Sequence, residues 1–192
     1  MTAIPATTKV LMIASGKGGV GKSSVTVNLA TALAATGFKV GVIDADIWGF
    51  SVPRMLGVDG RLEAGEADGR IAPHRQTVGR GELRIVSMGF LVDDEETALM
   101  WRGLILQRAV RHFLEDVDWG HDLDYLLIDM PPGTGDVQMG LAKLLPRAEM
   151  IVVTTPSLSA QKVAVRAVNM RRQHCLRTTG VVENMSAFVT PG

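Results

Sequence analysis

The chain has 192 residues, and its 20 Lys and Arg side chains balance its 20 Asp and Glu side chains, so the formal net charge is zero. A zero net charge gives no overall basic field and no support for binding to nucleic acid, although a local basic patch would not show in the total. No apolar run reaches the ~18 residues of a transmembrane helix. The first eight residues lack the pattern of a secretion signal. We therefore expect neither DNA nor a membrane as a partner.

A single cysteine, Cys175, excludes a disulfide within these residues and is typical of a reducing compartment, so a cytoplasmic location is expected. Apolar residues make up 46% and charged residues 21% of the chain, as in ordinary globular domains. We predict a short irregular arm at residues 1–8 and a single domain at residues 9–192, which is long enough for a sizeable core.

Apolar runs alternate with helix-forming segments along the chain. Strands are predicted at residues 10–14, 39–43, 82–88, 123–129, 150–154 and 180–182, with a weaker candidate at 70–78. Helices are predicted at residues 25–34, 104–114, 137–145 and 157–173, a loop or short turn at 47–57, and a surface loop at 57–70. This alternation predicts an α/β fold with a doubly wound, mostly parallel sheet. The chain ends soon after the last strand, so we expect a C-terminal part of the domain to be missing.

A glycine-rich stretch connects the first strand to the first helix. It consists of Gly16, Lys17, Gly18, Gly19, Val20, Gly21, Lys22 and Ser23. The pattern G-x-x-x-x-G-K-S in this setting indicates a phosphate-binding loop, whose backbone N–H groups surround an anion at a helix N-terminus. We expect Lys22 to reach the outer phosphates of a nucleotide and Ser23 to bind Mg²⁺. The stretch is identified as a P-loop NTPase motif.

Lys17 is an additional cation in this loop. It could be an ordinary solvated lysine, as most surface lysines are. However, GKGGVGKS also resembles the deviant Walker A loop of the ParA, MinD and nitrogenase-iron-protein class, in which a lysine at this position contacts nucleotide across a dimer interface. The resemblance implies that Lys17 acts in a partner's site, as a cation that stabilises phosphoryl oxygens.

Two carboxylates, Asp44 and Asp46, follow the second strand, where ligands bind in open α/β sheets. They could simply cap a turn. The functional interpretation is that the two carboxylates take part in the Mg²⁺ shell and in positioning the attacking water, because Mg²⁺ prefers oxygen ligands and keeps several waters.

Asp129 ends the apolar strand predicted at residues 123–129 and begins the sequence D-M-P-P-G-T-G-D, residues 129–136. A plain Pro-Gly turn is the alternative. An acid at the end of a core strand is the Walker B arrangement, so Asp129 is predicted to lie near Mg²⁺. The glycines that follow allow Gly133 to bring a backbone N–H to a γ-phosphate and to move when that phosphate leaves.

Together these motifs resemble the Mrp/ApbC family of P-loop ATPases, which carry iron–sulfur clusters. The resemblance covers residues 9–190 and also includes Trp101-Arg102-Gly103, for which no chemistry is evident, and Val182-Glu183-Asn184-Met185-Ser186. It implies slow, dimer-dependent ATP hydrolysis with Mg²⁺, a homodimer with nucleotide at the interface, and iron–sulfur apo-proteins as clients. It also implies that Asn184 binds adenine, although Asn184 could instead cap a strand end.

The cluster site of that family has no counterpart among these residues. Cluster-binding members continue from N-M-S into a C-x-x-C motif whose first cysteine precedes a proline, whereas here Thr190 precedes Pro191. A [4Fe–4S] cluster takes about four thiolates, so it is implied by resemblance alone. A ParA/MinD-like positioning ATPase and a nucleotide-binding scaffold without a cluster remain as alternatives. The four histidines show no metal-ligand spacing.

Overall fold

The computed structural model describes residues 4–46, 50–64, 69–91, 104–133, 136–157, 160–161 and 177–187. The strands are β1 (Lys9–Ala14), β2 (Lys39–Asp44), β3 (Glu63–Ala64), β4 (Ile71–Ala72), β5 (His74–Val78), β6 (Gly81–Ser87), β7 (Tyr125–Asp129), β8 (Glu149–Thr154) and β9 (Arg177–Glu183). The helices are α1 (Lys22–Ala35), α2 (Ser51–Leu56), the 3₁₀ turn η1 (Met88–Phe90), α4 (Leu104–Glu115) and α5 (Asp136–Leu144). None of these helices is long and apolar enough to cross a bilayer.

Seven strands form one sheet in the order β5-β6-β2-β7-β1-β8-β9. All neighbours pair in parallel except β5, which runs antiparallel to β6 at one edge. Strands β3 and β4 form a separate two-stranded pair. The predicted doubly wound, mostly parallel sheet is confirmed.

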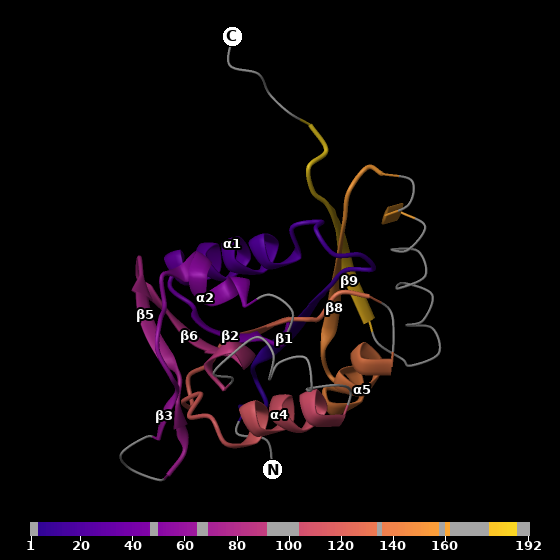
Figure 1. The fold of residues 1–192 in the computed structure, drawn as a ribbon. Helices are drawn as coiled ribbons and strands as arrows, with labels where there is room; N and C mark the ends of the chain where they lie inside the picture. Colours follow the sequence, from indigo (N-terminus) through magenta and orange to yellow (C-terminus); the bar gives the residue numbers. More distant parts are fainter. Residues whose placement is uncertain are drawn as a thin grey trace.

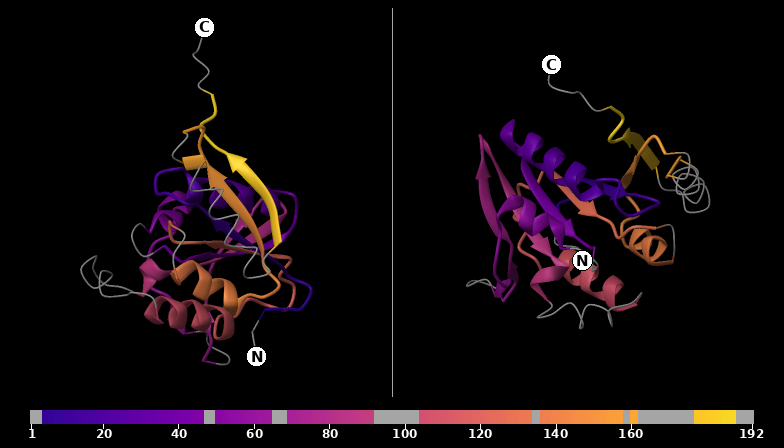
Figure 2. Two further views of the ribbon diagram at one scale, coloured as in Figure 1. Left: turned by 90° about the vertical axis from the view of Figure 1, so that its right-hand side faces the viewer. Right: turned by 45° about the horizontal axis from the view of Figure 1, so that its top comes forward.

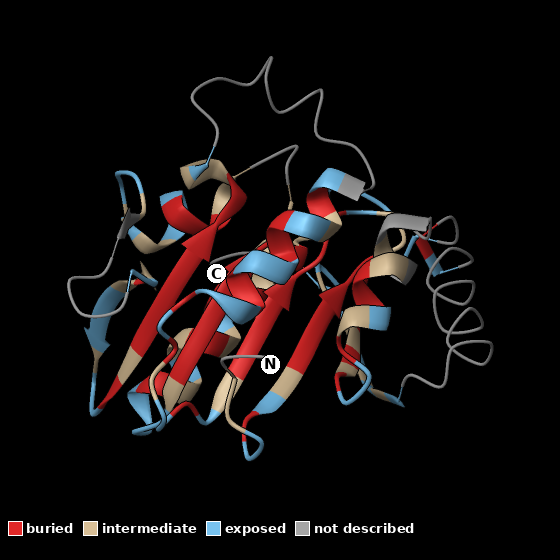
Figure 3. Ribbon diagram, turned by 90° about the horizontal axis from the view of Figure 1, so that it is seen from below, coloured by how far each residue is buried: buried red, intermediate tan, exposed pale blue. Residues whose placement is uncertain are grey.

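Helices lie on both faces of the sheet (Figure 1), with α1 and α2 on one side and α4 and α5 on the other. The views in Figure 2 show the same layers from two other directions. Each face has its own apolar core, built around Val27 of α1 on one side and Phe113 of α4 on the other. Because both faces are covered, the central strands are buried along most of their length (Figure 3), which explains their continuous apolar runs.

Two local predictions differ from the structure. The segment predicted as a loop or short turn contains the helix α2, which buries Val52 and ends at Gly57 in a left-handed conformation. The weak strand candidate at 70–78 is two strands, β4 and β5, separated at Pro73. Most of the predicted helix at 157–173, together with Cys175 and Trp101-Arg102-Gly103, lies outside the described residues.

The register of the parallel strands brings three polar residues to the same edge of the sheet. Asp44 at the end of β2 pairs with Asp129 at the end of β7 and with Ser87 at the end of β6. Asp129 in turn pairs with Ile13 of β1, immediately before the glycine-rich loop. Carboxylates separated by 85 residues of sequence therefore lie next to one another below the N-terminus of α1.

Candidate functional site

The glycine-rich loop ends at Gly21, and α1 begins at Lys22. Gly21 has φ 82° and ψ 26°, a left-handed conformation that glycine adopts without strain. No side chain caps this end of α1, and its first turn contains no acidic residue. The first backbone N–H groups of a helix have no intrahelical acceptor, so this end is suited to an anion.

Lys22 is held below the loop by the site's own carboxylates. Only 6% of its side chain is exposed, and its Nζ lies 2.7 Å from Asp129 Oδ2 and 3.6 Å from Asp46 Oδ2. A weaker contact of 3.3 Å joins Nζ to Ser23 Oγ. A nucleotide phosphate would have to compete with these carboxylates for the ammonium group.

Both oxygens of the buried Asp129 carboxylate accept hydrogen bonds. Ser23 Oγ donates to Oδ2 at 2.6 Å, and Thr26 Oγ1 donates to Oδ1 at 2.8 Å. Thr26 was not predicted as a site residue. Its position three residues after Ser23, and therefore on the same face of α1, was the only sequence signal for it.

Asp44 is completely buried, like Asp129 and Ser87 beside it. Its Oδ1 accepts from the Asp46 backbone N–H at 3.1 Å, and its Oδ2 accepts from Ser87 Oγ at 3.2 Å. Burial, followed by repulsion from Asp129, raises the pKa of Asp44 from 3.8 to about 7. Among the described residues at this edge of the sheet, the three carboxylates of Asp44, Asp46 and Asp129 share one nearby cation, Lys22.

The oxygen atoms at this edge fit a magnesium ion. Ser23 Oγ and Asp129 Oδ2 are 2.6 Å apart, close to the ~2.9 Å between adjacent ligands in an octahedron with Mg–O bonds of 2.0–2.1 Å. The described residues contain no group of three or more His, Cys, Asp and Glu side chains able to enclose a metal by themselves. That arrangement suits Mg²⁺, which is usually bound by one or two protein oxygens together with water and phosphate.

The segment after Asp129 is connected to the glycine-rich loop through backbone contacts. The Gly133 N–H donates to Ser15 O at 3.0 Å, so a γ-phosphate could accept from this N–H only after that bond breaks. Gln138 of α5, which was not predicted, donates from Nε2 to Pro131 O at 2.7 Å. The segment is thus connected to Ser15, between β1 and the glycine-rich loop, and to α5.

Asn184, which follows β9, lies beside the glycine-rich loop. Its Nδ2 donates to Val20 O at 3.0 Å, and a Cβ on Gly21 would lie only 2.2 Å from the same nitrogen. Its backbone N–H donates to Thr154 O at 2.8 Å, so Asn184 also continues the hydrogen bonding between β8 and β9 at the strand ends. Contact with adenine remains a prediction.

Of the predicted site residues, the structure brings together Lys22, Ser23, Asp46 and Asp129, with Asp44 directly behind them and Asn184 at the loop. Lys17, Gly18 and Gly19 are exposed on the outer side of the loop, Val20 is buried, and Gly16, Gly21 and Gly133 are partly buried. Lys17 does not belong to the cluster formed by Lys22, Asp46 and Asp129. Its role in a partner's site remains a prediction.

The chain has a longer curated relative of similar sequence. An iron–sulfur cluster carrier protein of Mycobacterium leprae is 50% identical over 184 residues, which are 96% of this chain and 46% of that protein. The chain therefore spans about half the length of this curated relative.

Two solved structures share the fold. A nucleotide-binding protein from Archaeoglobus fulgidus in complex with ADP superimposes with a TM-score of 0.79 at 36% identity, covering 95% of this chain and 69% of that one. The cell division ATPase MinD of Pyrococcus furiosus gives a TM-score of 0.66 at 26% identity, covering 91% and 71% of the two chains. Residues 6–192 match the family of NUBPL iron-transfer P-loop NTPases, and the chain belongs to that family.

Proposed function

We propose that the chain binds ATP with Mg²⁺ and hydrolyses it, and that it does so as part of an iron–sulfur cluster carrier. One observation carries the nucleotide part: Lys22 Nζ and Ser23 Oγ converge on the same oxygen of Asp129 at the uncapped N-terminus of α1. These are the groups that a nucleotide's phosphates and its magnesium ion require.

On nucleotide binding, the Lys22 ammonium moves from Asp129 to the outer phosphates, and the N–H groups at the start of α1 donate to the same oxygens. Ser23 and Asp129 are the residues that would hold Mg²⁺, with Asp44 behind them. When bound, the metal supplies positive charge that neutralises the phosphate oxygens. Asp46, released from its 3.6 Å contact with Lys22, accepts a hydrogen bond from the attacking water and orients it.

Hydrolysis in this proposal depends on a second copy of the chain. The exposed Lys17 enters the partner's site and stabilises charge that develops on the transferred phosphoryl group. The Gly133 N–H exchanges Ser15 O for the γ-phosphate, so loss of that phosphate returns the segment to its present contacts. The Asn184 side-chain amide gives up its hydrogen bond to Val20 O and bonds to the adenine base instead. A cytoplasmic location also remains a prediction.

The iron–sulfur cluster is the cargo in this proposal, and clients that accept it would be apo-proteins. Support comes from the names of the relatives and from the family, not from ligands among these residues. The chain has one cysteine, Cys175, so two copies together provide two of the ~4 thiolates that a cluster takes. A ParA/MinD-like positioning role has weaker support, because the MinD structure is less similar than the Archaeoglobus protein.

Calorimetric titration with ADP, in Mg²⁺ and in EDTA, tests the nucleotide site. We expect magnesium-dependent binding to the wild type and at least a ~100-fold loss in Lys22→Ala, because a charge-assisted contact to phosphate is lost. Lys143→Ala, at an exposed position of α5, is the matched control and should bind like the wild type. Absence of binding to the folded wild type would refute the proposal.

Hydrolysis and cargo need separate experiments. The rate of phosphate release per chain should rise with protein concentration and fall in Lys17→Ala, whereas a nucleotide-binding scaffold would release none.

Anaerobic incubation with iron and sulfide, followed by visible absorption spectroscopy, tests cluster binding. Cys175→Ser should abolish any absorption that depends on this chain's own thiol.

A further inference from the structure

Thr26 lies in the fifth position of α1, one turn beyond Lys22, and is completely buried. Its hydroxyl faces two acceptors, Asp129 Oδ1 at 2.8 Å and the Lys22 backbone carbonyl at 3.1 Å. A hydroxyl has one proton to donate. The shorter distance, to the charged acceptor, identifies Asp129 as the principal partner.

The two oxygens of Asp129 have different surroundings. Oδ2 faces the start of α1, where Ser23 donates to it at 2.6 Å and Lys22 approaches to 2.7 Å. Oδ1 points the other way, to Thr26. The terminal torsion of an aspartate is soft, so its side chain alone does not fix the angle at which the carboxylate plane faces the ligand. A donor on Oδ1 does fix it.

We propose that Thr26 is a positioning residue that orients the Asp129 carboxylate toward Mg²⁺. This inference rests on the proposed function. The ligand takes two of the three side-chain donors that the described residues give Asp129: Lys22 turns to phosphate and Ser23 turns its oxygen to the metal. Thr26 donates to Oδ1, on the side away from Ser23, and can keep this bond when the ligand is bound, so Oδ2 stays directed toward Ser23 Oγ, where the metal would bind.

A purely structural role makes a different prediction. Threonine in a helix often donates to the carbonyl four residues earlier, here Lys22 O, and such a bond contributes nothing to metal affinity. Removing the hydroxyl would then leave the magnesium dependence of nucleotide affinity unchanged. The ratio of ADP affinity in Mg²⁺ to that in EDTA therefore separates the two roles.

The test compares Thr26→Val, which keeps the branched shape and lacks the hydroxyl, with Thr26→Ser, which keeps the hydroxyl. Calorimetry should show the Mg²⁺/EDTA affinity ratio falling about 10- to 100-fold in Thr26→Val, the range found when a partner of a metal ligand is removed. Thr26→Ser should retain the ratio within about threefold. Affinity in EDTA should change little in either variant, because the second hydrogen-bond partner of the Thr26 hydroxyl is the Lys22 backbone carbonyl, an acceptor that does not bind phosphate.

The matched control is Thr36→Val, at the exposed C-terminus of the same helix, where the hydroxyl donates only to Leu33 O. It should behave like the wild type. Thr26→Ala serves as a second hydroxyl-free variant if the valine does not fold, as judged by circular dichroism. An unchanged ratio in a folded hydroxyl-free variant, or an equal loss in Thr26→Ser, would overturn the inference. Wild-type protein that binds no ADP at all would instead overturn the proposed function.

Discussion

Two clusters of charged side chains are built on the sheet, one around the buried Lys22 and one around the buried Arg84, and they differ in their balance of charge. The phosphate-edge cluster, at the carboxyl ends of the strands, consists of Lys22, Asp44, Asp46 and Asp129, one cation among three acids. The Arg84 cluster, near the beginning of β6, consists of Arg75, Glu82, Arg84, Asp118 and Asp122 and is nearly neutral.

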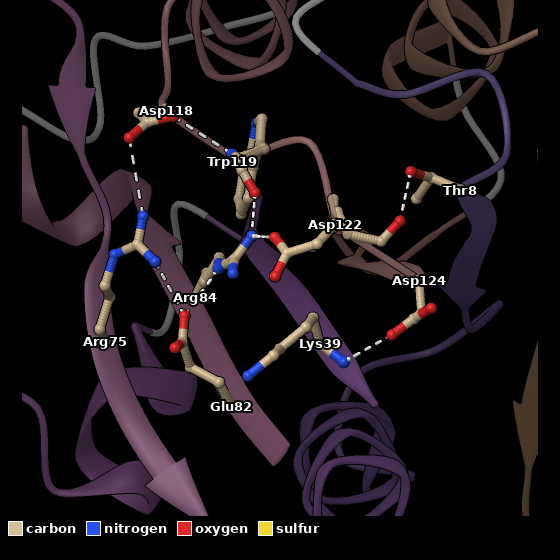
Figure 4. Close-up of polar contacts among 11 residues, drawn as sticks. Thr8, Lys39, Arg75, Glu82, Arg84, Asp118, Trp119, Asp122 and Asp124 are labelled. Carbon is tan, nitrogen blue, oxygen red and sulfur yellow. Dashed lines mark hydrogen bonds and ion pairs between the residues drawn. The ribbon is translucent and has the colours of Figure 1, made fainter. Parts of the chain in front are cut away.

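Figure 4 shows how completely the Arg84 cluster is paired. The buried Arg84 guanidinium donates from Nε to Glu82 Oε1 at 2.7 Å and from Nη1 to the Trp119 carbonyl. Nη1 also lies 2.8 Å from Asp122 Oδ1. Arg75 supplies a second cation to Glu82 at 2.9 Å. No ligand is needed to complete this arrangement.

The carboxyl groups of the two clusters have pKa values that are shifted in opposite directions. The hydrogen bond from Arg84 holds the pKa of Asp122 below its usual value. Burial alone would raise the pKa of Glu82, but Arg84 and the charges of Arg75 and Lys39 together outweigh it and lower the pKa. Burial and a neighbouring acid raise the pKa of Asp44 instead. The carboxylates of the Arg84 cluster are thus stabilised in their charged form, whereas the charged form of Asp44 is disfavoured, as is common at functional sites.

Replacement of Arg84 by Met should have the largest effect on stability. It removes charge-assisted bonds to Glu82 and Asp122 and leaves the Trp119 carbonyl without this donor. Leaving the buried carbonyl without this donor and losing two partly exposed ion pairs should cost about 2–4 kcal/mol, measured as the free energy of unfolding in urea. Arg80→Met, at an exposed turn, should cost less than ~0.5 kcal/mol. Nucleotide affinity of the folded variant should be unchanged, and a loss would show that the two clusters are coupled.

Replacement of Asp44 by Asn should stabilise the nucleotide- and magnesium-free protein. Because the folded-state pKa is raised, the stability that this group contributes is greatest below pH ~4 and is lost as the pH rises toward 7. A shift from 3.8 to about 7 corresponds to at most ~4 kcal/mol. Urea unfolding in EDTA should therefore show the variant more stable than wild type at pH 8 and equal at pH 4.

An exposed residue provides the control for that experiment. Asp59→Asn should follow the wild type at every pH, because Asp59 lies in an exposed loop. If Asp44→Asn were less stable than wild type at pH 8, the phosphate-edge cluster would not be short of positive charge, and the contrast with Arg84 would fail.

Two left-handed glycines, one near each cluster, give a matched pair. A Cβ on Gly120 (φ 73°) would meet Arg84 Nη1 at 2.4 Å, and one on Gly21 (φ 82°) would meet Asn184 Nδ2 at 2.2 Å. Alanine should cost each position about 1–2 kcal/mol in strain. Only Gly21→Ala should also weaken ADP binding in calorimetry. An equal loss of affinity in Gly120→Ala would contradict the separation of the two regions.

Sequence reasoning found the phosphate-edge cluster more readily than the Arg84 cluster, and the reason is physical. Lys22 and Asp129 belong to local patterns, and the ends of parallel strands meet at one edge whatever the strand order. For Thr26, the only sequence signal was its position three residues after Ser23, on the same face of α1. The contact of Arg84 with Asp122 depends on strand order and on the loop before β7, which no local pattern specifies. Burial of Asp44, and hence its raised pKa, likewise follows only from packing on both faces.

The smallest predicted effect is that of Glu82→Gln, and its sign is opposite to that of Asp44→Asn. The lowered pKa of Glu82 means that its contribution is present above pH ~4.5 and is lost as the pH falls through the folded-state pKa. Its side chain is 22% exposed, so solvent screening limits the contribution to ~1 kcal/mol. Urea unfolding should show the variant slightly less stable than wild type at pH 7 and equal at pH 3, with Glu115→Gln, at an exposed position of α4, unchanged throughout. A variant more stable than wild type at pH 7 would place Glu82 with the carboxylates that lack a cation.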